Sequence, residues 1–156
     1  MTKNKGFTLI ELLVVIAIIG ILSSIILISL NISRDKASDA KVKAQITGAK
    51  SSAEIFFDDN KSYNGVAGNV SNDCAPADSM FQDSASGMNQ YTDLTNYPLG
   101  TDIRCSSDGT DYVISASLHD SGQFWCVDSS GTAKQLSPAD GLHTTAHPDD
   151  ATTCGE

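Results

Sequence analysis

Three residues near the N-terminus combine types and spacing that could support chemistry: a glycine, an aromatic residue and an acid, at Gly6, Phe7 and Glu11. Glu11 is the only charged residue between Phe7 and Ile32, and a long apolar run follows it. A carboxylate at the centre of a membrane helix costs on the order of 2.5–3.5 kcal/mol, and less near an interface. Such an acid usually has a specific partner, so the chemistry that it predicts is ion pairing.

Four cysteines, Cys74, Cys105, Cys126 and Cys154, lie after the apolar run. An even number of cysteines beyond a membrane anchor indicates two disulfides formed in an oxidising compartment. No CxxC spacing occurs, which disfavours zinc binding and thioredoxin-like chemistry. Of the three possible pairings we prefer Cys74–Cys105 with Cys126–Cys154, which would tie a long loop and the C-terminal tail to a sheet; the other two pairings stay open.

A polar cluster near the C-terminus holds two of the three histidines and three acids: His143, His147, Asp140, Asp149 and Asp150. It is a candidate metal site, but Pro148 and the neighbouring threonines favour coil over the helix that would align the histidines. The oxygen-rich spacing of a defined calcium loop is missing, so calcium is only a minor alternative and we expect no cofactor. Nucleophile-elbow, Walker and GxGxxG patterns are absent, so we expect no enzymatic activity.

The net charge of −9 is unevenly distributed along the chain. Residues 33–60 carry five bases and five acids, whereas residues 61–156 carry three bases and thirteen acids. Binding to a phosphate backbone needs a basic surface, so we expect no direct binding to nucleic acid. The acidic C-terminal part is interpreted as a soluble surface.

The chemistry near the N-terminus must be positioned by a helix. Residues 12–30 are almost entirely apolar, and about 20 such residues span a bilayer as a helix. Lys3 and Lys5 precede the run, which predicts a cytoplasmic N-terminus and an external C-terminal part. A secretory signal peptide is disfavoured, because the run is too long and no small-residue cleavage site follows it. A plain signal anchor fits everything except Glu11.

After the apolar run the pattern becomes amphipathic. Spacings of 4, 3, 4 and 3 place five apolar residues on one helix face: Val42, Ile46, Ala49, Ala53 and Phe56. No proline interrupts residues 7–59, so a single helix of about 50 residues is predicted. We divide the chain into a leader (1–6), an apolar helix (7–32), its amphipathic continuation (33–60) and a head (61–156).

The head combines a long connection with strand patterns. Residues 61–100 are rich in turn-forming residues, with a short helix expected near residues 79–82. Strands are predicted over residues 101–105, 112–118, 123–128 and 132–136, with Asp108-Gly109 marking a hairpin. Ile114, Ala116 and Leu118 should face the helix. The predicted fold class is α+β, a long helix packed on an antiparallel sheet of three or four strands.

Residues 6–16, GFTLIELLVVI, resemble the processing site of type IV pilins and type II secretion pseudopilins. This resemblance implies the pilin fold, cleavage after Gly6 by a prepilin peptidase, and methylation of the new Phe7 amino group. It also implies that Glu11 pairs with the positive N-terminus of a neighbouring subunit, which would offset the penalty of burying either charge alone. Residues 125–131, WCVDSSG, resemble part of bacterial pilin-like heads.

The resemblance implies a structural subunit that lies in the cytoplasmic membrane, in contact with lipid, and then enters an extracellular filament or periplasmic pseudopilus. Its implied partners are further copies, related minor pilins, the peptidase and an inner-membrane assembly platform. A pseudopilin of a secretion or DNA-uptake system is the alternative within the family. A membrane-anchored binding module that never polymerises is the alternative of another class, which an intact Met1 would favour.

Overall fold

The computed structural model describes residues 6–65, 68, 70, 74–119, 122–137 and 153–155. The chain divides into two compact units, Met1–Lys36 and Ala37–Glu156. One helix, α1 (Leu9–Asn60), contributes to both units. The second unit comprises the head (residues 61–156) and the part of α1 from Ala37 on. The remaining elements all belong to the head: η2 (Met80–Gln82), α2 (Asn89–Thr92), η3 (Leu94–Asn96), β1 (Ile103–Ser107), β2 (Tyr112–Ser117), β3 (Phe124–Asp128) and β4 (Ala133–Leu136).

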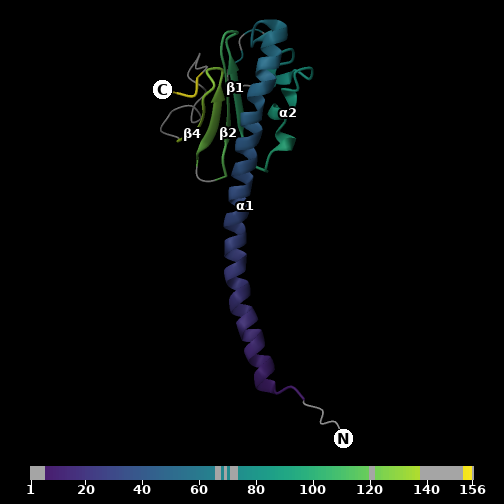
Figure 1. The fold of residues 1–156 in the computed structure, drawn as a ribbon, viewed down its shortest axis with the longest axis vertical. Helices are drawn as coiled ribbons and strands as arrows, with labels where there is room; N and C mark the ends of the chain where they lie inside the picture. The colour runs from purple at the N-terminus through teal and green to yellow at the C-terminus, as the bar shows by residue number, and fades with distance from the viewer. Residues whose placement is uncertain are drawn as a thin grey trace. The chain divides into compact units, whose positions relative to one another are not determined.

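The four strands form one antiparallel sheet in the order β1-β2-β3-β4, so each strand pairs with its neighbour in sequence (Figure 1). The first hairpin turns at Gly109, whose positive φ of 96° suits glycine. The predicted α+β architecture, with an antiparallel sheet of three or four strands, is therefore confirmed, and the sheet has four. The first strand was predicted too early, over residues 101–105; β1 ends at Ser107, because Ser107 exchanges backbone hydrogen bonds with Val70 and pairs with Tyr112.

The predicted apolar stripe of the amphipathic helix forms the main core of the head. Its five members, Val42, Ile46, Ala49, Ala53 and Phe56, are all buried. They share one cluster with Tyr112, Ile114, Ala116 and Leu118 from β2 and the residue after it. The prediction that alternate residues of this strand face the helix is confirmed. Trp125 of β3 adds a polar link, since its Nε1 donates to Thr47 Oγ1 at 2.9 Å.

A second, smaller core was not anticipated from the sequence. It contains Val113, Cys126, Leu136 and Cys154, which form a cluster separate from the helix-facing one. Val113 alternates with the helix-facing residues of β2, so this cluster lies on the other face of the sheet. The sheet is therefore buried on two faces, and residues near the C-terminus contribute to the second.

In its described part, the connection between α1 and the sheet contains more helix than predicted. The short helix expected near residues 79–82 is present as η2, but α2 and η3 were missed. Local hydrogen bonds explain them: the Asp93 carboxylate accepts from the Thr95 amide at 2.9 Å and caps η3. Thr92 Oγ1, at the end of α2, donates to the carbonyl of Phe81 at 2.6 Å and links α2 to η2.

Candidate functional site

The backbone that leads into α1 is exposed and irregular. Gly6, Phe7 and Thr8 belong to no helix or strand, and α1 begins at Leu9. Phe7 is 85% exposed. A peptidase needs an accessible segment that it can hold in extended form, and a helix withholds its backbone groups in internal hydrogen bonds. Gly6 and Phe7 are exposed and lie outside the helix, so their backbone groups are not held in helical hydrogen bonds.

The first turn of α1 is closed by a reciprocal pair of hydrogen bonds between Thr8 and Glu11. The Thr8 amide and hydroxyl both donate to Glu11 Oε2 at 2.8 Å. In return the Glu11 amide donates to Thr8 Oγ1 at 3.3 Å. This arrangement is a capping box, in which a threonine at the N-cap and an acid three residues later satisfy backbone donors at the start of a helix.

Thr8 is the residue of this site that sequence reasoning missed. Residues 8–11 have the pattern Thr-x-x-Glu directly before an apolar run, which is a sequence signature of a helix start. It changes the interpretation of Glu11, because this acid already has a partner within its own chain. The positive end of the helix dipole also favours a carboxylate at this position.

The same carboxylate has capacity for a second partner. Both bonds from Thr8 fall on Oε2, and within the described part of the chain Glu11 Oε1 accepts no hydrogen bond. An ionised carboxylate has about four lone-pair sites on its two oxygens. Glu11 can therefore cap its own helix and accept an external cationic donor at the same time.

The apolar half of α1 has no cover within its own unit. Its described large apolar side chains are all exposed, from 44% for Leu30 to 77% for Leu9. By length and composition, α1 is the one helix in the described ranges that could cross a membrane, and none of its apolar window is buried. A surface of this kind is covered either by lipid or by other protein.

The four cysteines form two disulfides in the head, Cys74–Cys105 and Cys126–Cys154. These are the pairs that the sequence analysis preferred. The first attaches the connection after α1 to β1. The second attaches the C-terminal segment to β3, across 28 positions of sequence.

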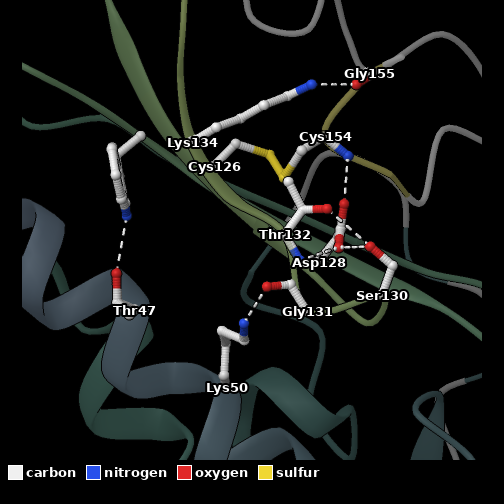
Figure 2. Close-up of a disulfide and its surroundings, with 11 residues drawn as sticks. Thr47, Lys50, Cys126, Asp128, Ser130, Gly131, Thr132, Lys134, Cys154 and Gly155 are labelled. Atoms are coloured by element: carbon white, nitrogen blue, oxygen red, sulfur yellow. Dashed lines mark hydrogen bonds between the residues drawn. A yellow bond between two sulfur atoms is a disulfide. The ribbon is translucent and has the colours of Figure 1, made fainter.

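Asp128, at the end of β3, holds the C-terminal segment next to the second disulfide (Figure 2). Its Oδ2 accepts the Cys154 amide at 2.9 Å, and its Oδ1 accepts the Ser130 hydroxyl at 2.6 Å and the Thr132 amide at 3.1 Å. Burial by itself raises the pKa of this carboxyl, but the hydrogen bonds from Ser130, Cys154 and Thr132 outweigh it, and the pKa is lower than usual. Asp128 is thus a buried anion that organises both the β3–β4 turn and the C-terminus.

The turn that Asp128 organises also contacts the helix. Lys50 of α1 donates to the carbonyl of Gly131 (Figure 2). Glycine at this position accommodates a φ of 91°. The segment that resembled pilin-like heads, residues 125–131, therefore connects β3 to α1 at both of its ends, through Trp125 and Gly131.

Among the described residues, no group of three or more histidine, cysteine, aspartate or glutamate side chains is arranged to hold a metal ion. The polar cluster of His143, His147 and nearby acids, considered in the sequence as a candidate metal site and disfavoured there, lies outside the described residues. His119 is described, and its amide donates to the Asp39 carboxylate at 2.7 Å.

Comparison with known proteins connects the N-terminal site to a methylation motif. Residues 1–27 match the family described as the prokaryotic N-terminal methylation motif. The chain is 36% identical over 110 residues to the type IV wide pilus major component PilA4 of Thermus thermophilus, which covers 65% of this chain and 79% of that protein. Because α1 ends at Asn60, an alignment of this length includes part of the head.

Shorter matches link the chain to secretion proteins. It is 39% identical over 61 residues to the type II secretion system core protein G of Klebsiella michiganensis, and 36% identical over 61 residues to that of Escherichia coli. These matches cover 39% of this chain, and 43% and 42% of the two relatives. The chain therefore aligns with less than half the length of these secretion proteins.

Proposed function

The chain belongs to the family of type IV pilins and type II secretion pseudopilins, and from that premise we propose that it is a structural subunit of a type IV pilus or related filament. The observation that carries the proposal is the start of α1. An exposed Gly6-Phe7 bond directly precedes a capped helix whose apolar residues are uncovered. A subunit that is first held in lipid and then packed against other copies needs both an accessible cleavage site and an uncovered apolar helix.

We propose that a prepilin peptidase cleaves after Gly6, which removes residues 1–6, and that the new amino group of Phe7 is methylated. The match of residues 1–27 to a methylation motif supports both steps. Cleavage changes the electrostatics of the site, because it replaces a neutral amide with an amino group that is largely protonated near pH 7. The mature chain then carries a cation at Phe7 and an anion at Glu11.

Pairing of these two charges between subunits would determine how an incoming subunit aligns with one already in place. A charge left unpaired in an apolar environment is expensive, and removing one partner of a buried pair costs about 3–5 kcal/mol. Both bonds from Thr8 fall on Glu11 Oε2, which leaves Oε1 of a subunit already in place open to the Phe7 amine of an incoming subunit. We propose that this pairing selects the register in which the apolar helices bundle.

In this proposal the chain crosses the cytoplasmic membrane once before assembly, with residues 7–32 in lipid and the head, residues 61–156, outside. Residues 33–60 join the two, since their buried stripe packs in the head. Further copies, related minor pilins, the peptidase and an inner-membrane assembly platform are the proposed partners. The contribution of the head is structural rather than catalytic, and it requires no cofactor.

The proposal is tested by isolating sheared surface filaments from cells that express the chain. We expect electron microscopy to show filaments, and mass spectrometry to find this protein in them, beginning at a methylated Phe7. A protein that keeps Met1 and remains entirely in the membrane fraction would contradict the proposal, and would favour a membrane-anchored binding module instead.

A pseudopilin is the second candidate, because the shorter matches are to core components of type II secretion. We rank it second, since the match to a pilus component extends into the head whereas those matches span 61 residues. Deletion of the gene distinguishes the two functions: loss of surface filaments supports a pilus, whereas accumulation of secreted enzymes in the periplasm supports a pseudopilus.

A further inference from the structure

The turn between η3 and β1 presents a leucine to solvent. Leu99 is 102% exposed and Leu94, in η3, is 56% exposed. Isolated exposed leucines are common on protein surfaces. Leu99 differs from most of them in how firmly its backbone is held.

Leu99 occupies the tip of a hydrogen-bonded turn. The Thr101 amide donates to the Pro98 carbonyl at 3.2 Å, and the Thr101 hydroxyl donates to the same oxygen at 2.9 Å. Gly100 follows with a φ of 91°, which glycine adopts without strain. Tyr97, on the other side, is buried, and its hydroxyl donates to the carbonyl of Tyr91 at 2.6 Å. Leu99 is therefore exposed on a turn whose backbone is fixed by hydrogen bonds.

A hollow of about 230 Å³ lies beside this turn, within the head. Val42, Leu118 and Pro98 supply its apolar lining, and Leu99 stands at its side. Asp39 supplies a carboxylate, which accepts the amide of His119 at 2.7 Å. Ser38, Thr101, Ser117 and His119 also line the hollow, so the hollow and the turn together make a mixed surface on which Leu99 is the fully exposed apolar side chain and Asp39 supplies an acid.

A second acid lies at the other end of the segment. Asp93 is exposed and precedes Leu94. Hydrogen bonds from the amide and the hydroxyl of Thr95 lower the pKa of its carboxyl, so Asp93 is ionised at neutral pH. Both donors are neutral groups, which leaves the negative charge available to an outside cation.

The same chain carries a surface with the complementary pattern. In the last part of the apolar helix, Leu27 is 63% exposed and Ile32 is 53% exposed. Arg34 and Lys36 lie two and four positions after Ile32, on either side of Asp35, and both bases are exposed. The helix segment 25–36 thus carries exposed apolar residues and, with Asp35 counted, one net positive charge, which complements the exposed Leu94 and Leu99 and the acids Asp39 and Asp93.

We propose that the Leu99 turn and the adjoining hollow dock onto residues 25–36 of a second copy of this chain. The inference rests on the proposed filament function and names the head-to-helix contact within it. The two surfaces differ, so the contact is heterologous and repeats from copy to copy. Such a contact produces an open helical filament unless the rotation closes a ring. Lipid covers residues 7–32 before assembly, so docking accompanies extraction from the membrane.

Photocrosslinking in assembled filaments tests the contact directly. A benzophenone amino acid replaces Leu99, which keeps the position large and apolar, and sheared filaments are irradiated and digested. We expect crosslinked dimers whose adducts map to residues 25–36 of a second copy. Adducts elsewhere on the second copy, on another protein or only within one chain would overturn the proposal. The same probe at Ile55, which is 50% exposed on α1, serves as the matched control.

A substitution supplies the second measurement. Leu99→Ser removes the apolar tip without disturbing a buried contact, and we expect at least about tenfold weaker assembly, in line with the burial of a leucine side chain. Leu99→Met should assemble like the wild type, and Ile55→Ser should be unaffected. Equal filament yields from Leu99→Ser and wild type would reject the docking surface alone. Absence of filaments from the wild type, despite cleaved and folded protein, would reject the proposed function as well.

Discussion

Thr8 and Glu11 hold each other across the first turn of α1, with the Thr8 amide and hydroxyl both 2.8 Å from one carboxylate oxygen of Glu11. Glu11 therefore has two separable properties. As a hydrogen-bond acceptor it closes the helix start, and as an anion it attracts the amine of another subunit. Substitutions that preserve one property and remove the other can distinguish their contributions.

Glu11→Gln keeps an acceptor for the Thr8 amide, since glutamine also closes a capping box, but it removes the negative charge. We expect normal leader cleavage and a normal helix start, with filaments lost or reduced at least about tenfold, because the Phe7 amine of the neighbour has no anion to pair with. Immunoblotting of cleaved protein and electron microscopy of sheared filaments measure the two effects. Wild-type filament yield from Glu11→Gln would show that the charge is dispensable.

Thr8→Val tests the contribution of the Thr8 hydroxyl to the capping box. It removes the hydroxyl but keeps the shape of the side chain, and we expect the first turn of α1 to lose about 1 kcal/mol of stability. Amide hydrogen exchange of the full chain in detergent micelles should become faster at residues 9–12 and stay unchanged at residues 42–56. Thr8→Ser is the matched control, because it retains the hydroxyl. Equal exchange in Thr8→Val and the wild type would mean that the cap adds no stability.

Asp128→Asn should destabilise the head. The amide can replace only part of what the anion accepts from Cys154, Ser130 and Thr132, and hydrogen bonds to charged groups contribute about 1.5–3 kcal/mol each. Urea unfolding followed by the fluorescence of Trp125, the single tryptophan, reports the loss. Asp58→Asn, at an exposed ion pair with Lys61, should change stability by less than about 0.5 kcal/mol. Similar midpoints for both variants would contradict the role assigned to Asp128.

The same carboxylate predicts how the stability of the head depends on pH. The pKa of Asp128 is lower in the folded protein than in the unfolded chain, where it is about 3.9. Its contribution is therefore complete above the unfolded pKa and is lost as the pH falls through the folded pKa. We expect the free energy of unfolding to fall below about pH 4, and to fall less in Asp128→Asn. Parallel pH profiles of the two proteins would count against this assignment.

Removing the second disulfide should loosen one face of the sheet and spare the other. The double variant Cys126→Ser, Cys154→Ser is expected to lose about 2–4 kcal/mol. Amide exchange should increase in β4 and near residue 154, whereas the helix-facing core around Ile46 should remain protected, because the two clusters are separate. Protection lost equally on both faces would show that the two cores unfold as one.

Much of the fold was predictable because its signals are local or periodic. The spacing from Val42 to Phe56 identifies a helix face without reference to any distant residue, and the alternation around Ile114 identifies the strand face that meets it. The capping box of Thr8 and Glu11 was missed but could have been predicted in the same way, because both partners lie within one turn of helix. Gly6, Phe7 and Glu11 identified the family for the same reason.

Local patterns in the sequence predict an apolar helix, an amphipathic stripe and a set of strands, each from residues within a few positions of one another. The pairing of the cysteines, the place of Val113 in a second core and the hydrogen bond from the Cys154 amide to Asp128 depend on the tertiary arrangement. These features join residues far apart in the chain, and their partners follow from how the strands register and where the chain returns. A turn such as that of Leu99 is locally encoded, but its exposure depends on what the rest of the head leaves uncovered.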